Sequence, residues 1–105
     1  MATPDTRELT GSPRVQGVDE EIVHEVVTPT GTAPTTVTVV VKDTTDSSAD
    51  VTATVMPSGS ASVSTDTITL PVLKLLEAGH WYRVEVKFTS GANVFERFFR
   101  VQAEE

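Results

Sequence analysis

The most regular pattern in the chain is an alternation of apolar and polar residues from Trp81 to Thr89. Successive side chains of a β-strand point to opposite faces, so the pattern predicts a strand with one face in a protein core. The core-facing positions are Tyr82, Val84, Val86 and Phe88. The other face carries charges of both signs, and we expect it to lie in solvent. Its members are Trp81, Arg83, Glu85, Lys87 and Thr89.

Weaker alternation predicts six further short strands, about seven in all, at 21–28, 35–42, 51–56, 61–65, 66–70 and 94–102. Residues 14–18 could form an additional short first strand. In 35–42 the odd-numbered valines are expected to point inward, and Val40 is an apolar residue on the outer face. The small side chains of 61–65 suit the edge of a sheet. Residues 90–93 predict a tight hairpin turn.

Two strands leave their facing open. In the strand at 21–28, the core face is either the set that contains His24 or the set that contains Glu25. In the last strand, strict alternation places Phe98 opposite the core. Either a β-bulge near Arg97 reconciles the pattern, or Phe98 is exposed beside Trp81.

One segment has the leucine content of a helix. Pro71 suits a first helical position and Gly79 a position just past a helix end, which predicts a short crossover helix near 72–78. Leu73 and Leu76 would point from it into the core. The alternative is a crossover turn between two strands. With valine and threonine each present 17 times, the rest of the chain favours extended structure.

Length and composition exclude several classes of protein. A chain of 105 residues predicts a single domain, with an extended N-terminal arm at 1–13 and a β-sandwich at 14–105. There is no cysteine, so disulfide scaffolds and thiolate metal sites are excluded. The net charge of -7 disfavours nucleic acid and anionic membranes as partners. The N-terminus lacks the pattern of a signal peptide, and we expect synthesis in a cytosol without secretion.

No pattern of catalytic residues is evident. No spacing pairs His24 with His80, and no nucleophile elbow or phosphate-binding loop is present. The acidic turn at 43–50 lacks the glycine and glutamate of an EF-hand, which favours a plain turn over a calcium site. We therefore expect no enzyme activity, no cofactor and no metal.

Surfaces are the remaining candidates for function. Trp81 is expected on an outer sheet face, with Phe98, Val94 and Val40 on the same side, and exposed aromatic residues mark interfaces. The alternative is that Trp81 packs under the N-terminal arm or the crossover segment. The arm is a second candidate, because an extended segment can add to a sheet edge of a neighbour. Its interface candidates are Arg7 and Leu9.

The segment Leu75–Val84 resembles the E–F corner and F strand of immunoglobulin-like domains. Tyr82 matches the tyrosine that caps this corner, and Val84 matches the core position that holds cysteine in antibodies. The absence of cysteine points to the disulfide-free members of that group. The resemblance implies an all-β, immunoglobulin-like β-sandwich of about seven strands with the short helix near 72–78.

A narrower resemblance is to small immunoglobulin-like proteins in the structural modules of tailed bacteriophages. Those proteins often end in a hairpin of the form G-x-Y-x-V-x-V-x-F, a short turn, then F-x-V. The matching residues here are Gly79, Tyr82, Val84, Val86, Phe88, Phe99 and Val101, with one residue more between the glycine and the tyrosine. The resemblance implies a non-enzymatic virion structural protein that docks on capsid, neck or tail as a decoration or accessory protein.

The implied partners are major capsid, neck or tail proteins, with a homo-oligomer possible in the assembly, and the implied location is the virion. The alternative function is a carbohydrate- or cell-surface-binding module that uses Trp81 and Tyr82 as a stacking platform.

Overall fold

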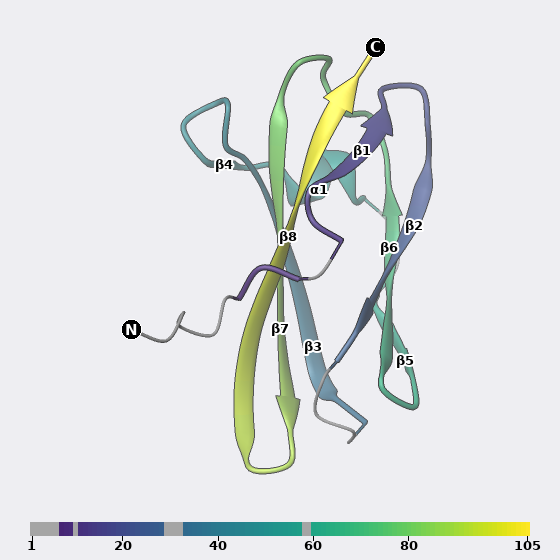
Figure 1. The fold of residues 1–105 in the computed structure, drawn as a ribbon, viewed down its shortest axis with the longest axis vertical. Helices are drawn as coiled ribbons and strands as arrows, with labels where there is room; N and C mark the ends of the chain where they lie inside the picture. Colours follow the sequence, from purple (N-terminus) through teal and green to yellow (C-terminus); the bar gives the residue numbers. More distant parts are fainter. Residues whose placement is uncertain (1–6, 10, 29–32, 58–59) are drawn as a thin grey trace.

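The computed structural model describes residues 7–9, 11–28, 33–57 and 60–105, which form two facing β-sheets (Figure 1). The strands are β1 (Arg14–Gly17), β2 (Ile22–Val27), β3 (Thr35–Asp43), β4 (Ala49–Asp50), β5 (Ser62–Ser64), β6 (Thr67–Leu73), β7 (Trp81–Ser90) and β8 (Asn93–Glu104). Sheet A has the order β1-β8-β7-β3-β4, and sheet B has the order β2-β6-β5. A short helix, α1 (Thr52–Val55), follows β4.

The strand order is that of an immunoglobulin-like sandwich. β3, β7 and β8 take the places of strands C, F and G, and β2, β6 and β5 take those of B, E and D. β1 runs parallel to β8, whereas the other strand pairs are antiparallel. The predicted all-β sandwich class is thereby confirmed.

The core lies between the sheets and is built from the predicted alternation. The apolar face of β7 is almost fully buried, with no predicted member more than 2% exposed. Opposite it, sheet B contributes Val26, Ile68, Leu70 and Leu73. Burial of apolar area on this scale is the main term that stabilises a domain of this size.

The strand pairing shows which face of β2 and which face of β8 point toward the core. In β2, His24 and Val26 are buried, and a register shift lies between Val23 and Glu25. The β7–β8 register is unbroken from end to end, so no bulge forms near Arg97. Phe98 therefore lies on the outer face of sheet A.

The expected helix near 72–78 is not formed, and the alternative, a crossover between two strands, joins β6 to β7. Pro71 lies inside β6, opposite the irregular part of β2 and beyond the end of β5, where its missing N–H breaks no ladder bond. Leu75 adopts a left-handed backbone with φ of 61°, which ends any helical path. Leu73 and Leu76 are both buried, as expected.

The short helix lies instead at 52–55, where a strand was expected. The Asp50 carboxylate accepts hydrogen bonds from the Thr52 N–H and hydroxyl, at 3.0 and 2.7 Å. The Thr52 hydroxyl in turn accepts a hydrogen bond from the Val41 N–H at 2.8 Å. These local bonds replace a ladder and turn the chain from sheet A toward sheet B. Val55 and Met56 are buried by this turn.

A hydrogen bond to Tyr82 closes the corner before β7. The Glu77 N–H donates to the Tyr82 hydroxyl at 2.8 Å, while the Tyr82 ring is 2% exposed. This is the tyrosine corner that the resemblance implies. The bond fixes the path of the chain from sheet B into sheet A.

Replacing Tyr82 with phenylalanine is expected to lower the free energy of unfolding by about 1 kcal/mol, because the Glu77 N–H loses its partner while ring packing is kept. Urea unfolding of Tyr82→Phe and the parent protein measures this. Phe88→Tyr makes the reverse chemical change, since it adds a hydroxyl without a partner in the core, and it should destabilise as well. Equal stability of Tyr82→Phe and the parent would contradict a structural role for the corner bond.

The outer edge of β8 is covered by two segments from the start of the chain. The backbones of Arg7 and Leu9 form hydrogen bonds with the backbone of Phe98, at 2.8 Å each. Farther along β8, the four residues of β1 pair in parallel with Val101–Glu104. Part of the expected arm therefore lies along the sandwich. Residues 1–6 and 10 of that arm are outside the described residues.

Candidate functional site

The outer face of sheet A holds most of the predicted interface residues. Val40, Glu85 and Phe98 form a cross-strand row through β3, β7 and β8. The Arg83 guanidinium carbon lies 3.7 Å from the centre of the Phe98 ring, which is the distance of a close cation–π contact. Its Nε lies 2.8 Å from a Glu85 carboxylate oxygen. This buried Nε–H nonetheless has no well-aligned hydrogen-bond acceptor among the described residues.

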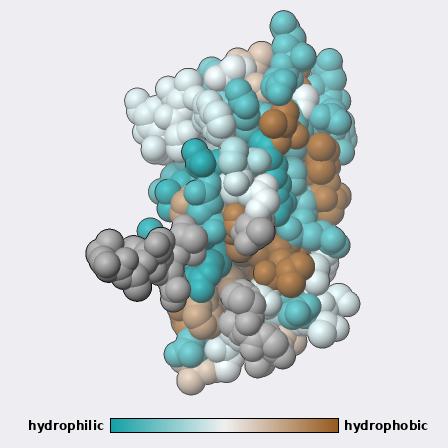
Figure 2. Space-filling view, in the orientation of Figure 1, coloured by the Kyte–Doolittle hydropathy of each residue, from teal (hydrophilic) through white to brown (hydrophobic). Residues whose placement is uncertain are grey.

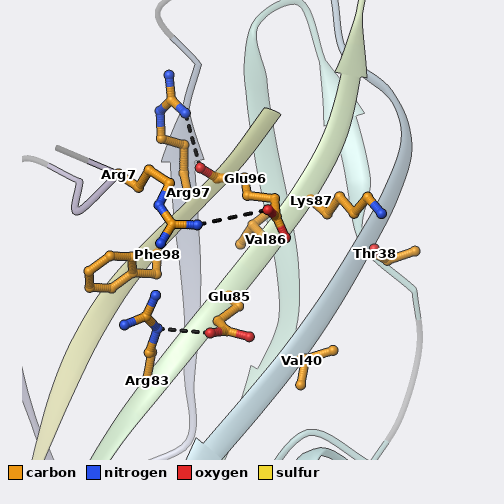
Figure 3. A pocket seen from close by; sticks show the side chains of 10 residues that line it. All are labelled: Arg7, Thr38, Val40, Arg83, Glu85, Val86, Lys87, Glu96, Arg97 and Phe98. Carbon is orange, nitrogen blue, oxygen red and sulfur yellow. Dashed lines mark hydrogen bonds and ion pairs between the residues drawn. The ribbon is translucent and has the colours of Figure 1, made fainter. Parts of the chain in front are cut away.

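These residues line an open groove (Figure 3). Its lining is Arg7, Thr38, Val40, Arg83, Glu85, Val86, Lys87, Glu96, Arg97 and Phe98. Phe98 and Val40 lie on opposite sides of Glu85, and Arg97 points away from Phe98 (Figure 3). The groove has a volume of about 110 Å³. Pockets for small-molecule ligands are roughly 300–1,000 Å³, so this one suits a single side chain of a larger partner.

The other predicted interface residues lie apart from the groove. Trp81 pairs with Gln102, four residues along β8 from Phe98, and is half-buried with the Arg100 guanidinium 5.6 Å from its ring. Val94 is 60% exposed near the β7–β8 hairpin. Leu9 packs against the core instead of projecting from it. The structure therefore does not gather the expected residues into one continuous apolar patch.

The arm contributes charge to this face. Arg7 lies 3.8 Å from the Glu96 carboxylate at the groove. Glu8 accepts hydrogen bonds from the Ser12 hydroxyl and from Arg100 Nε, both at 2.6 Å. Both hydrogen bonds lower the pKa of Glu8, and the one from Ser12 has the larger effect. Sequence reasoning missed this arrangement because it depends on the long-range pairing of residues 7–9 with β8.

The proposed carbohydrate platform is not formed by the two aromatic side chains together. Tyr82 points into the core from the opposite face of β7, as alternation requires, and is 2% exposed. Trp81 alone is left on the surface. A stacking platform of Trp81 with Tyr82 is therefore excluded by the facing of the strand.

One group of possible metal ligands lies at the end of β3. Ligand atoms of Asp43, Glu77 and His80 lie within 4.8 Å of one another. However, Asp43 Oδ1 already accepts two backbone N–H groups of the 43–46 turn, and Oδ2 lies 2.7 Å from His80 Nδ1. The hydrogen bond to Asp43 raises the pKa of His80. The group thus fastens the tyrosine corner to the turn after β3.

The other acidic side chains of the 43–50 turn do not converge with Asp43 on a shared site. Asp50 binds Thr52, and these hydrogen bonds lower the pKa of Asp50. Asp46 is exposed, and its backbone N–H belongs to the turn. Asx-type hydrogen bonds account for the composition of this turn.

A second polar cluster is buried between the sheets. Arg14 Nη1 lies 3.1 Å from His24 Nδ1, and His24 Nε2 lies 2.8 Å from the side-chain oxygen of Gln16. The Gln16 amide donates to the carbonyls of Leu73 and Glu20, at 2.7 and 3.1 Å. Since arginine only donates, His24 Nδ1 must accept, and the ring proton lies on Nε2. Every polar atom of Gln16 is then satisfied.

This cluster favours a neutral histidine. Burial, with a further contribution from the Arg14 charge, lowers the pKa of His24 to about 4. The Arg14 guanidinium also lies 4.0 Å from the Phe99 ring centre, so its position is fixed by packing. The cluster ties β1, at the edge of sheet A, to β2 in sheet B.

Apolar side chains are also exposed away from the groove. Figure 2 shows hydrophobic surface over β1 and β2, the strands that carry Val15, Val23 and Val27. These three side chains are 54–63% exposed. Scattered exposed apolar residues are ordinary on soluble domains, and they lie among polar surface here.

No family model, curated protein or solved structure matches this chain significantly. The described part of the chain also contains no helix with the length and apolar character needed to cross a membrane.

Proposed function

We propose that this chain is a non-enzymatic docking module of a larger assembly, and that the groove on the outer face of sheet A is its contact surface. The observation that carries the proposal is the row of Val40, Glu85 and Phe98, with Arg83 held over the Phe98 ring. Partly exposed aromatic and arginine side chains are the usual anchors of protein interfaces.

The assembly we propose is the particle of a tailed bacteriophage, in which the chain is a decoration or accessory protein on capsid, neck or tail. This assignment is supported by the resemblance of the terminal hairpin, from Gly79 to Val101, to those virion proteins. Its partners would be major capsid, neck or tail proteins. The role needs shape complementarity and repeated copies, and it needs no reacting group.

Cosedimentation tests this proposal. The purified protein is mixed with phage particles that lack it and is followed through a density gradient. We expect it to migrate with the particles at a fixed, saturable stoichiometry. If it stays at the top of the gradient at every concentration, the virion proposal is wrong.

Replacing Phe98 with serine is expected to weaken particle binding at least about 10-fold, because interface anchors commonly contribute 2 kcal/mol or more. Val63→Ser is the matched control, since Val63 is 38% exposed on β5 in the other sheet. Circular dichroism shows whether each variant is folded. If both variants bind particles as the parent does, the contact lies elsewhere on the molecule.

A further inference from the structure

We infer that the partner of the groove is an acidic protein segment, in which carboxylate side chains flank an apolar one. The inference rests on the proposed function and adds the chemistry of the partner to it. The groove is lined by four of the chain's eight basic residues and by two of its fifteen acidic residues; of the four, only Arg97 points away from Phe98. The groove is therefore a positive surface on a chain whose net charge is -7.

The positive charge of the groove is only partly neutralised from within. Glu85 is shared by Arg83, at 2.8 Å, and by Lys42, at 3.7 Å. Glu96 is 3.8 Å from Arg7. Among the described residues, neither Lys87 nor Arg97 forms an ion pair with a carboxylate; the Arg97 guanidinium instead donates to the Glu96 carbonyl at 3.0 Å. Lys87, on the outer face of sheet A, is thus available to an anionic partner, whereas Arg97 pairs with the core-facing Val86 and points away from Phe98.

The groove also offers an apolar contact between its charges. Phe98 and Val40 are both half-buried and lie across Glu85 from each other. Arg83 is held between the Phe98 ring and the Glu85 carboxylate, so little of its side-chain entropy would be lost on binding. A guanidinium placed in this way suits a carboxylate, which it can bind through two parallel hydrogen bonds.

An acidic peptide fits this charge distribution better than a nucleic acid does. Outside the groove the chain is strongly acidic, with thirteen of its fifteen acidic residues. A long polyanion would extend beyond the groove, where thirteen acidic residues outnumber four basic ones, and like charges repel over a screening length of about 8 Å at physiological salt. A short acidic segment places its carboxylates on the cations and ends there.

The test uses a short fluorescein-labelled peptide of Asp, Glu and Leu, and a matched peptide with Asn and Gln in place of the acids. Fluorescence anisotropy measures their binding to the full chain. We expect the acidic peptide to bind, with an affinity that falls at higher salt, and the neutral peptide to bind at least about 10-fold more weakly. Equal binding of the two peptides would overturn the inference.

Variants locate the contact. Lys87→Gln is expected to weaken binding of the acidic peptide about 3-fold, and Lys87→Gln combined with Arg83→Gln about 10-fold. Lys74→Gln removes the same charge from the connection between β6 and β7, outside the groove, and should change affinity less than 2-fold. If Lys74→Gln weakens binding as much as Lys87→Gln does, the effect is overall charge and the groove is not the site.

Two further outcomes would also overturn it. One is that a single-stranded oligonucleotide binds as tightly as the acidic peptide and with the same dependence on Lys87, which would make the groove a phosphate site. The other is self-association that Lys87→Gln abolishes in analytical ultracentrifugation, which would make the occupant a second copy of this chain.

The test is separable from that of the proposed function. If particles bind the Lys87→Gln, Arg83→Gln variant as they bind the parent, the docking proposal stands and the acidic-partner inference fails. If the acidic peptide binds in the groove while the protein never migrates with particles, the inference stands and the virion proposal fails.

Discussion

Replacing Gln16 with leucine is expected to lower the free energy of unfolding by about 3–5 kcal/mol. Gln16 is 0% exposed, and its amide bonds to two backbone carbonyls and to the His24 ring. Leucine has a similar volume, but it leaves the Leu73 carbonyl and the His24 Nε2–H without partners in a buried site. Each such unsatisfied group costs about 1–3 kcal/mol. Urea unfolding at neutral pH measures the loss.

Gln102→Leu is the matched control. Gln102 lies on the outer face of β8, opposite Trp81, so the same change there should alter stability by less than about 0.5 kcal/mol. Equal effects of the two substitutions would mean that the buried hydrogen bonds of Gln16 contribute little. The expected difference would instead identify the Arg14–His24–Gln16 cluster as a main tie between the sheets.

Lowering the pH from 7 to 4.5 is expected to destabilise the protein by about 2 kcal/mol through His24 alone. Its pKa in the folded state is lowered to about 4, below the unfolded value of 6.5. The stabilisation is therefore fully present above pH 6.5 and is lost as the pH falls toward 4. Physically, a second ring proton would point at the Arg14 guanidinium, which cannot accept it. Urea unfolding at a series of pH values measures the slope.

His80 changes the stability with pH in the opposite direction to His24, so the two contributions must be measured separately. The hydrogen bond to Asp43 raises its folded pKa, so its contribution is present below pH 6.5 and is lost as the pH rises through the raised value. In His80→Gln the loss of stability on acidification should be steeper than in the parent. In His24→Gln it should largely disappear between pH 6.5 and 5, where most carboxylates stay ionised. A parent-like slope in His24→Gln would assign the acid sensitivity to other groups.

The sequence predicted the strands that alternate and failed where local signals conflicted with tertiary contacts. β7 was evident because one face is wholly apolar and the other polar. The segment after Pro71 carries helix signals, yet Leu73 pairs with Ile22 and the Lys74 N–H bonds to the Val55 carbonyl at 2.8 Å. Packing against two distant segments overrides propensity there, and no local pattern reports those contacts.

The candidate site was predictable only in part, for a similar reason. Alternation put Arg83, Glu85 and Lys87 on one outward face, and it placed Phe98 correctly if no bulge was assumed. What it could not give is the contribution of Arg7, which reaches the groove because the start of the chain pairs with β8. The stacking of Arg83 on Phe98 likewise depends on cross-strand register.

The segments that cover one edge of β8 protect that edge while adding little to the core. Residues 7–9 and 14–17 occupy the hydrogen-bonding groups along one side of the longest strand, which has twelve residues. Of the two covering segments, only Leu9 and Gln16 add much to the interior. The edge of sheet A on this side is therefore the four-residue β1 in place of the twelve-residue β8, and a shorter edge strand offers fewer unpaired backbone groups to a strand of another molecule.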